Sequence, residues 1–167
     1  MSTARGGPRP CSATVFCCGE QHGRENMFKQ VHHVALVVAD LDASSAWYSG
    51  MLGFKPERRF GFPEAGVQIA HLVSEMGLRV ELIQQTGSSR SPDEGKDVFG
   101  ALVTQGIKHV GLLVDDIDQT AQELKARGVE IVLEVTAVAP AGVKNFWIRD
   151  NSGNLIEINQ WLEQEKA

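Results

Sequence analysis

The feature that most constrains the fold of this chain is an internal repeat. Residues 33–42 read HVALVVADLD, and residues 109–118 read HVGLLVDDID. Each segment begins with a histidine, continues through an apolar run and ends in an acidic turn. The offset between the two histidines is 76 residues, and the same offset leads from Glu81 to Glu157. The repeat therefore predicts two copies of one supersecondary unit in a single chain.

The residues that the repeat duplicates are His33, Glu81, His109 and Glu157. Imidazole nitrogens and carboxylate oxygens are common ligands of divalent ions, so the set predicts one metal site built from both copies. A lone histidine or glutamate in a strand is usually an ordinary surface or hydrogen-bonded residue. Burying four ionisable side chains on the inner side of the modules costs free energy unless they have a partner, which favours a bound metal ion. The residues do not choose among Zn, Ni, Co, Mn and Fe.

Composition limits the other function classes. The chain has 167 residues, of which 43% are hydrophobic, and a formal charge of -5. That length suits one compact domain or two small fused modules. The absence of a basic stripe argues against a nucleic-acid partner. No apolar run approaches the roughly 18 residues that span a bilayer, which argues against a membrane protein. All three cysteines precede residue 27, so no disulfide framework is expected, and a cytoplasmic setting is predicted.

Periodicity predicts an α+β fold of two tandem β-α-β-β-β modules, residues 29–84 and 108–162. The histidine-led strand 30–38 is predicted to be buried on both faces. A linker over residues 85–107, with a short helix at 96–105, is predicted to cover a site. Residues 1–28 are predicted to be a disordered or non-native tail, and residues 163–167 a polar tail. The other predicted elements are strands 54–59, 66–73, 78–83, 108–114, 129–138, 144–149 and 154–161, and helices 43–51 and 119–127.

Three motifs carry a family resemblance: HVALVV with DLD at 33–42, WYSGMLGF at 47–54 and RDNSGNLIEI at 149–158. With them, residues 29–161 resemble the vicinal oxygen chelate superfamily, which includes glyoxalase I, methylmalonyl-CoA epimerase, extradiol dioxygenases and bleomycin resistance proteins. The resemblance implies that the modules form a curved, cup-like mixed sheet around a metal site. It places the duplicated histidines and glutamates inside that cup.

The resemblance implies a metal-dependent isomerase or lyase of the glyoxalase I or methylmalonyl-CoA epimerase kind. Such an enzyme moves a proton next to a carbonyl of a thioester, hemithioacetal or similar small molecule, through an enediolate. Glu157 is the first candidate for the base, and Glu81 is a spectator ligand or a second base. Glu64 is either a second acid or base, as in the epimerases, or a solvated turn residue. Arg79 is either a contact for an anionic substrate group or a surface residue.

Two other classes remain open. A non-haem iron dioxygenase binds its ion with two histidines and one carboxylate, and Glu81 would occupy a position that oxygen needs. A binding-only protein of the bleomycin resistance type would keep the fold without the ligands. His32 and His71 break the repeat, and we expect them to be structural or exposed. Modules of this family pair within a chain or across a homodimer, and the sequence leaves both arrangements open.

Overall fold

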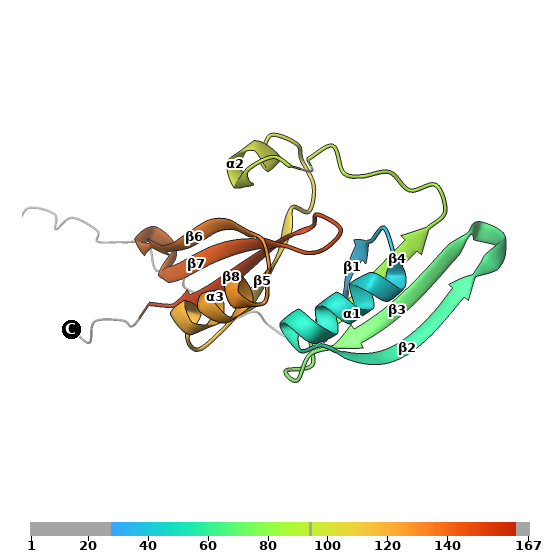
Figure 1. The fold of residues 1–167 in the computed structure, drawn as a ribbon, viewed down its shortest axis with the longest axis horizontal. Coiled ribbons are helices and arrows are strands. Elements are labelled where there is room, and N and C mark those ends of the chain that lie inside the picture. The colour runs from blue at the N-terminus through green and yellow to red at the C-terminus, as the bar shows by residue number, and fades with distance from the viewer. Residues whose placement is uncertain (1–27, 94, 163–167) are drawn as a thin grey trace, which may run out of the picture. The chain divides into compact units, whose positions relative to one another are not determined.

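The computed structural model describes residues 28–93 and 95–162. The chain divides into the units Met1–Gln30 and Val31–Ala167, and the second unit carries both modules. It contains two four-stranded mixed sheets with helices (Figure 1), which confirms the predicted α+β class. In the described residues the strands pair as two separate sheets and do not close into a barrel. None of the described helices has the length and apolar character needed to span a membrane. The predictions for residues 1–27, including all three cysteines, and for 163–167 lie outside the described residues.

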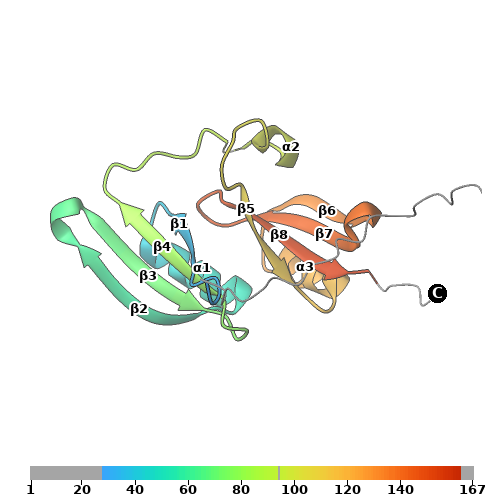
Figure 2. The ribbon, with the colours of Figure 1, turned by 180° about the vertical axis from the view of Figure 1, so that it is seen from behind.

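The first module forms a sheet with the strand order β1-β4-β3-β2. Strand β1 runs parallel to β4, and the other neighbours are antiparallel (Figure 2). The register places Ala35 opposite Glu81. The elements are β1 (Val34–Val37), α1 (Leu41–Leu52), β2 (Lys55–Phe62), the short 3-10 helix η1 (Pro63–Ala65), β3 (Val67–Val73) and β4 (Arg79–Gln85).

The second module repeats this topology with the order β5-β8-β7-β6. Strand β5 runs parallel to β8, and Gly111 lies opposite Glu157. The short helix α2 (Val98–Ala101) lies in the linker, within the segment predicted for it. The elements are β5 (His109–Leu113), α3 (Ile117–Ala126), β6 (Ile131–Val138), η2 (Ala139–Ala141), β7 (Val143–Arg149) and β8 (Leu155–Trp161).

The acidic turns of the repeat start both long helices. The Asp40 carboxylate accepts a hydrogen bond from the backbone N–H of Ala43 at 2.8 Å. The Asp116 carboxylate accepts the equivalent bond from Gln119 at 2.9 Å. Each bond satisfies a backbone donor that has no partner inside the first turn of a helix. The two predicted helices are therefore present and are capped by the acidic turns, and each begins two residues earlier than predicted.

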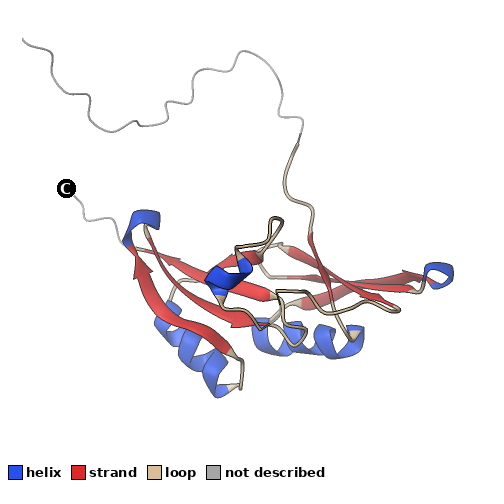
Figure 3. Cartoon of the chain, turned by 90° about the horizontal axis from the view of Figure 1, so that it is seen from above, coloured by secondary structure: helices blue, strands red, loops and turns tan. Residues whose placement is uncertain are grey.

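The core lies on the helix-facing side of both sheets. Leu72 and Leu82 are fully buried, as are their repeat counterparts Ile148 and Ile158, and all four belong to one cluster. Figure 3 shows α1 and α3 against the same side of the strands. Side chains alternate across a strand, so Glu81, which lies between the buried Val80 and Leu82, points away from the helix-covered side. We call the side of each sheet that faces away from α1 or α3 the open face.

The prediction that the first strand is buried on both faces is wrong. Val38 is buried, but Ala35 and Val37 are exposed, and 54% of Val37 is accessible. The reason is that the helices pack on one side only, so the face shared by His33, Ala35 and Val37 has no covering layer. This exposure leaves the side of the sheet that carries His33 accessible to a ligand.

A buried hydrogen bond joins the two modules. The Tyr48 hydroxyl, on α1, donates to Asp150 Oδ2 at 2.9 Å, and both side chains are buried. The other Asp150 oxygen accepts from the backbone N–H groups of Ser152 and Asn154. Burial, followed by the neighbouring Asp150 charge, raises the pKa of Tyr48 far above its ordinary value, so the phenol stays a donor. The turn after β7 is thereby attached to the helix of the other module.

We expect Tyr48→Phe to lower the free energy of unfolding by about 1.5 to 3 kcal/mol, because it removes a buried hydrogen bond to a charged group. Urea denaturation followed by fluorescence measures the loss. The exposed Trp161 provides the control, since Trp161→Phe should change stability by no more than about 0.5 kcal/mol. Equal stability of Tyr48→Phe and the natural chain would contradict a stabilising role for this bond.

Candidate metal-binding site

The first predicted pair of ligands, His33 and Glu81, comes together on the open face of the first sheet. Nε2 of His33 lies 3.6 Å from Oε1 of Glu81. His33 immediately precedes β1, and Glu81 lies in the middle of β4, the parallel neighbour of β1. The side chains are 34% and 16% exposed, so the pair is open to small molecules from the solvent.

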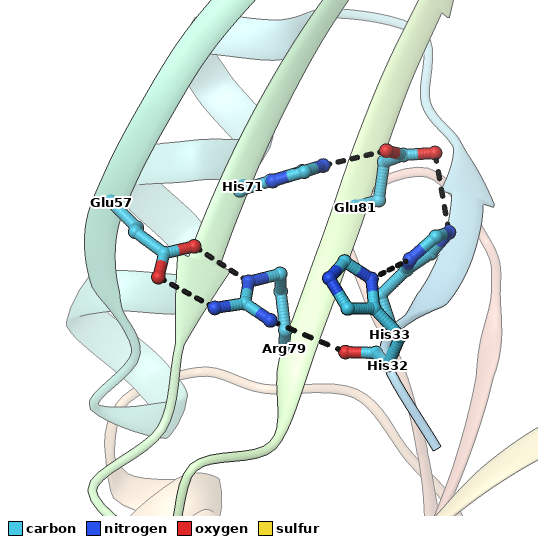
Figure 4. Close-up of polar contacts among 6 residues, drawn as sticks. All are labelled: His32, His33, Glu57, His71, Arg79 and Glu81. Carbon is cyan, nitrogen blue, oxygen red and sulfur yellow. Dashed lines mark hydrogen bonds and ion pairs between the residues drawn. The ribbon is translucent and has the colours of Figure 1, made fainter. Parts of the chain in front are cut away.

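Two further histidines surround this pair (Figure 4). His71 lies directly opposite Glu81 in the β3–β4 register, and its Nε2 donates to Glu81 Oε2 at 2.6 Å. The Nδ1 atoms of His32 and His33 lie 2.7 Å apart, so one of these two nitrogens donates to the other. Because that contact uses Nδ1 of His33, its Nε2 is the nitrogen that faces Glu81. Both Glu81 oxygens therefore face imidazole rings.

The second predicted pair, His109 and Glu157, forms on the open face of the second sheet. Nε2 of His109 lies 3.4 Å from Oε2 of Glu157. The remaining oxygen, Oε1, accepts a hydrogen bond from Nδ2 of Asn145 at 2.7 Å. The His109 ring meets the edge of Trp147 with 4.5 Å between ring centroids. The two pairs thus share their ligand types and differ in the residues around them.

The separation within each pair suits a shared metal ion. Two ligands about 2.1 Å from one ion lie about 3.0 to 3.4 Å apart when the angle at the ion is between a right angle and tetrahedral. The observed separations of 3.6 Å and 3.4 Å are close to that range. Each pair can therefore supply one nitrogen and one oxygen ligand.

The structure brings the four predicted ligands together as two pairs and not as one cluster. Across residues 28–93 and 95–162, no group of three or more His, Cys, Asp or Glu side chains is arranged to hold an ion. Each pair lies on the open face of its own sheet. A site with four ligands would require a His33–Glu81 pair to lie next to a His109–Glu157 pair.

Arg79 lies on the same face of β4 as Glu81, and it already has a carboxylate partner. Its Nε and Nη2 atoms donate to the two oxygens of Glu57, each at 2.6 Å (Figure 4). These hydrogen bonds lower the pKa of Glu57 and raise that of Arg79. An anionic substrate group could reach Arg79 only in competition with Glu57.

Glu64 lies away from Glu81 of the first pair. It is exposed in η1, at the tip of the hairpin formed by β2 and β3. The register pairs Val67, which follows this tip, with Gln85, four residues beyond Glu81 on β4. At about 3.3 Å per residue, that places the tip more than about 13 Å from Glu81. The acid–base role of Glu64 remains a prediction that the geometry does not favour.

Two residues of the site were not assigned to it by sequence reasoning. His71 was expected to be structural or exposed, yet it contacts Glu81 directly and its side chain is 13% exposed. Sequence patterns do not indicate Asn145, because an asparagine in a strand gives no sign of its partner. Pairing the β3 and β4 segments residue by residue would have found His71. Asn145 is not directly opposite Glu157, and only the folded side chains show its contact.

The linker packs on the open face of the second sheet. Val98 and Ala101 of α2 form a buried cluster with Trp147 and Leu155. Arg149 donates to the carbonyl oxygen of Lys96, which holds the segment before α2. Since Trp147 also contacts His109, the linker covers the part of the face next to the second pair.

Asp93 organises the polar side of this linker. Its carboxylate accepts from Lys96 at 2.8 Å, from Lys108 at 2.9 Å and from Thr104 at 3.2 Å. The hydrogen bonds from Lys96 and then Lys108 lower the pKa of Asp93 far below its usual range. Lys108 immediately precedes His109, so Asp93 connects the linker to the start of β5.

Comparison with known proteins agrees with this fold. The sequence model of the Glyoxalase/Bleomycin resistance protein/Dioxygenase superfamily matches residues 30–158. The mitochondrial methylmalonyl-CoA epimerase of Bos taurus is 29% identical over 78% of this chain and 74% of its own length. The lactoylglutathione lyase of Haemophilus influenzae is 29% identical over 77% of this chain and 90% of its own length.

A solved structure is similar at the level of the fold. The crystal structure of a glyoxalase family protein from Enterococcus faecalis superposes with a TM-score of 0.66. The match covers 79% of this chain and 98% of that protein, at 22% identity. This likeness shows the fold.

We expect Asp93→Asn to loosen the linker at neutral pH, seen as faster amide hydrogen exchange in α2. Because the folded-state pKa of Asp93 is lowered, its contribution is present above the ordinary Asp pKa of about 3.9 and is lost as the pH falls through the folded value. The ratio of the variant's exchange rate to that of the natural chain should therefore be constant from pH 7 to about pH 5 and approach one in stronger acid. The exposed ion pair of Asp118 with Lys144 supplies the control, Asp118→Asn, which should leave α2 unchanged. Identical exchange in all three proteins would contradict the role of Asp93.

Proposed function

Since the chain belongs to the Glyoxalase/Bleomycin resistance protein/Dioxygenase superfamily, we propose that it is a metal-dependent enzyme that moves a proton on a carbon next to a carbonyl. The observation that carries the proposal is the duplicated pairing of a histidine Nε2 with a glutamate oxygen, at 3.6 Å and 3.4 Å. Relatives named as an epimerase and as a lyase support an isomerase or a lyase. The proposed substrate is a thioester, a hemithioacetal or a similar small molecule with two neighbouring oxygens.

In this proposal the two pairs hold the metal, with His33, Glu81, His109 and Glu157 as ligands. Zn, Ni, Co, Mn and Fe all suit two nitrogen and two oxygen donors. When bound, a divalent ion supplies a Lewis acid that stabilises negative charge on the substrate oxygens. The partial exposure of both pairs supports access of such a substrate from the open face.

Glu157 is the proposed base. Its carboxylate accepts a proton from the substrate carbon, so that the C–H bond breaks, an O–H bond forms and the electron pair moves toward the carbonyl oxygen. The proton on the carboxyl group exchanges with solvent, and a proton is then delivered either to that carbon or to its neighbour. Glu81 is proposed either as a ligand that stays in place or as a second base; its oxygens face the rings of His33 and His71.

We further propose that two copies of the chain complete each site. In the residues that the structure describes, one chain does not gather three ligands, so a pair from each of two copies would supply the set. The open face of the first sheet also exposes Val37, Phe60 and Phe62, and Phe60 contacts His71. A second copy would cover this apolar surface. A closed dimer with twofold symmetry would hold two equivalent sites.

Subunit complementation tests this arrangement. We expect the reconstituted natural chain to bind about one tight divalent ion per chain, and His33→Ala and His109→Ala each to lose it. A heterodimer of the two variants, isolated with two affinity tags, should recover about one tight site per dimer, since one site then receives both intact pairs. Elemental analysis gives the stoichiometry. No recovery, or a monomer in solution, would contradict the shared site. Less than about a tenth of an ion per natural chain would contradict the metal itself and favour a binding-only protein.

Glu157→Gln should slow solvent deuterium exchange at the α-carbon of a thioester or hemithioacetal by at least about 100-fold, because an amide cannot act as the base. Mass spectrometry of the recovered substrate measures the exchange. Glu134→Gln, which changes an exposed strand residue paired with Lys125, is the control and should keep the full rate. Unchanged exchange in Glu157→Gln would remove Glu157 as the base. Oxygen uptake with a catechol, without exchange, would favour the dioxygenase alternative.

A further inference from the structure

The two glutamates are held by chemically different neighbours. Glu81 receives a hydrogen bond from the imidazole of His71, directly opposite it on β3. Glu157 receives one from the amide of Asn145 on β7, whereas the residue directly opposite it is Trp147. Under the repeat offset, His71 corresponds to Trp147 and Asn145 corresponds to Ile69. The repeat therefore duplicates the two glutamates but not the side chains that donate hydrogen bonds to them.

The contact of Asn145 selects one oxygen of Glu157. Asn145 is 8% exposed, and its Nδ2 donates to Oε1 at 2.7 Å. With Oε1 engaged, Oε2 is the oxygen that lies 3.4 Å from Nε2 of His109. A glutamate side chain has several rotatable bonds, and a hydrogen bond at one oxygen restricts the direction of the other. Losing this donor would let the carboxylate turn away from His109.

The repeat also indicates that the fold does not need an amide at this position. Ile69, the counterpart of Asn145, is a buried apolar residue in the same place on β3. The backbone of a β-α-β-β-β module therefore accepts an apolar side chain at this strand position. A buried polar side chain is costly unless it has a hydrogen-bond partner, and Glu157 provides one for Asn145.

We propose that Asn145 is a positioning residue that holds Oε1 of Glu157 and thereby presents Oε2, next to His109, as the metal-binding oxygen. This inference rests on the proposed function, because it takes Glu157 as a metal ligand. His71 holds Glu81 in the corresponding way in the first module, through a different strand position. Asn145 acts through Glu157 and does not itself contact the substrate.

The test compares cobalt binding by the natural chain, Asn145→Ile and the matched variant Ile69→Val. Partners that orient metal ligands change affinity by about 10- to 100-fold, so we expect the Co²⁺ dissociation constant of Asn145→Ile to rise by that factor. The visible absorption of bound cobalt, which reports ligand geometry, should change as well. The metal-free variant should still unfold in one cooperative transition, which shows that the fold is kept. Ile69→Val should bind cobalt as the natural chain does.

The outcomes separate this inference from the proposed function. Tight cobalt binding by the natural chain, with the same dissociation constant and spectrum in Asn145→Ile, would overturn the role of Asn145 and leave the metal site intact. Absence of cobalt binding by the natural chain would overturn the proposed function and this inference with it. If Asn145→Ile does not fold, Asn145→Leu, which is closer in shape to asparagine, is measured against the same two criteria.

Discussion

The site depends on the parallel pairing of the first and last strands of each module. Parallel strands require a crossover connection, and the helix in that connection packs on one side of the sheet. Strand alternation then assigns one set of side chains to the core and the other to the open face. With Ala35 opposite Glu81 and Gly111 opposite Glu157, a histidine and a glutamate meet on each open face. The meeting of a histidine and a glutamate on each open face is thus a direct consequence of the topology.

The same topology explains why the pairs are accessible. Both long helices lie on one side, so the larger cluster of buried residues is on the side opposite the histidine–glutamate pairs. The side chains around the pairs can therefore be substituted without removing residues from the main hydrophobic core. The residues around the two pairs show such a change, because His71 and Trp147 occupy one repeat position while Ile69 and Asn145 occupy another. Each module has a histidine–glutamate pair, but the side chains around the pair differ between the modules.

The open faces are also where the two modules acquire different roles. In the second sheet, α2 packs on Trp147 beside His109, and Asp93 connects the linker to β5 through Lys108. In the first sheet, the Glu57–Arg79 ion pair lies on the face of Glu81. The His109–Glu157 pair therefore has a covering segment beside it, and the His33–Glu81 pair lies on a charged and aromatic surface.

The sequence by itself determined the two-module fold, the acidic turns that precede both long helices, and the duplication of the two histidines and the two glutamates. These follow from local periodicity, capping and a repeat that preserves register. It did not determine the exposure of the first strand, the partner of Arg79, or the contacts of His71 and Asn145. Those depend on which side the helices cover and on side-chain contacts across strands, which residue order alone does not specify. Only the tertiary structure decided that the four predicted ligands lie as two pairs.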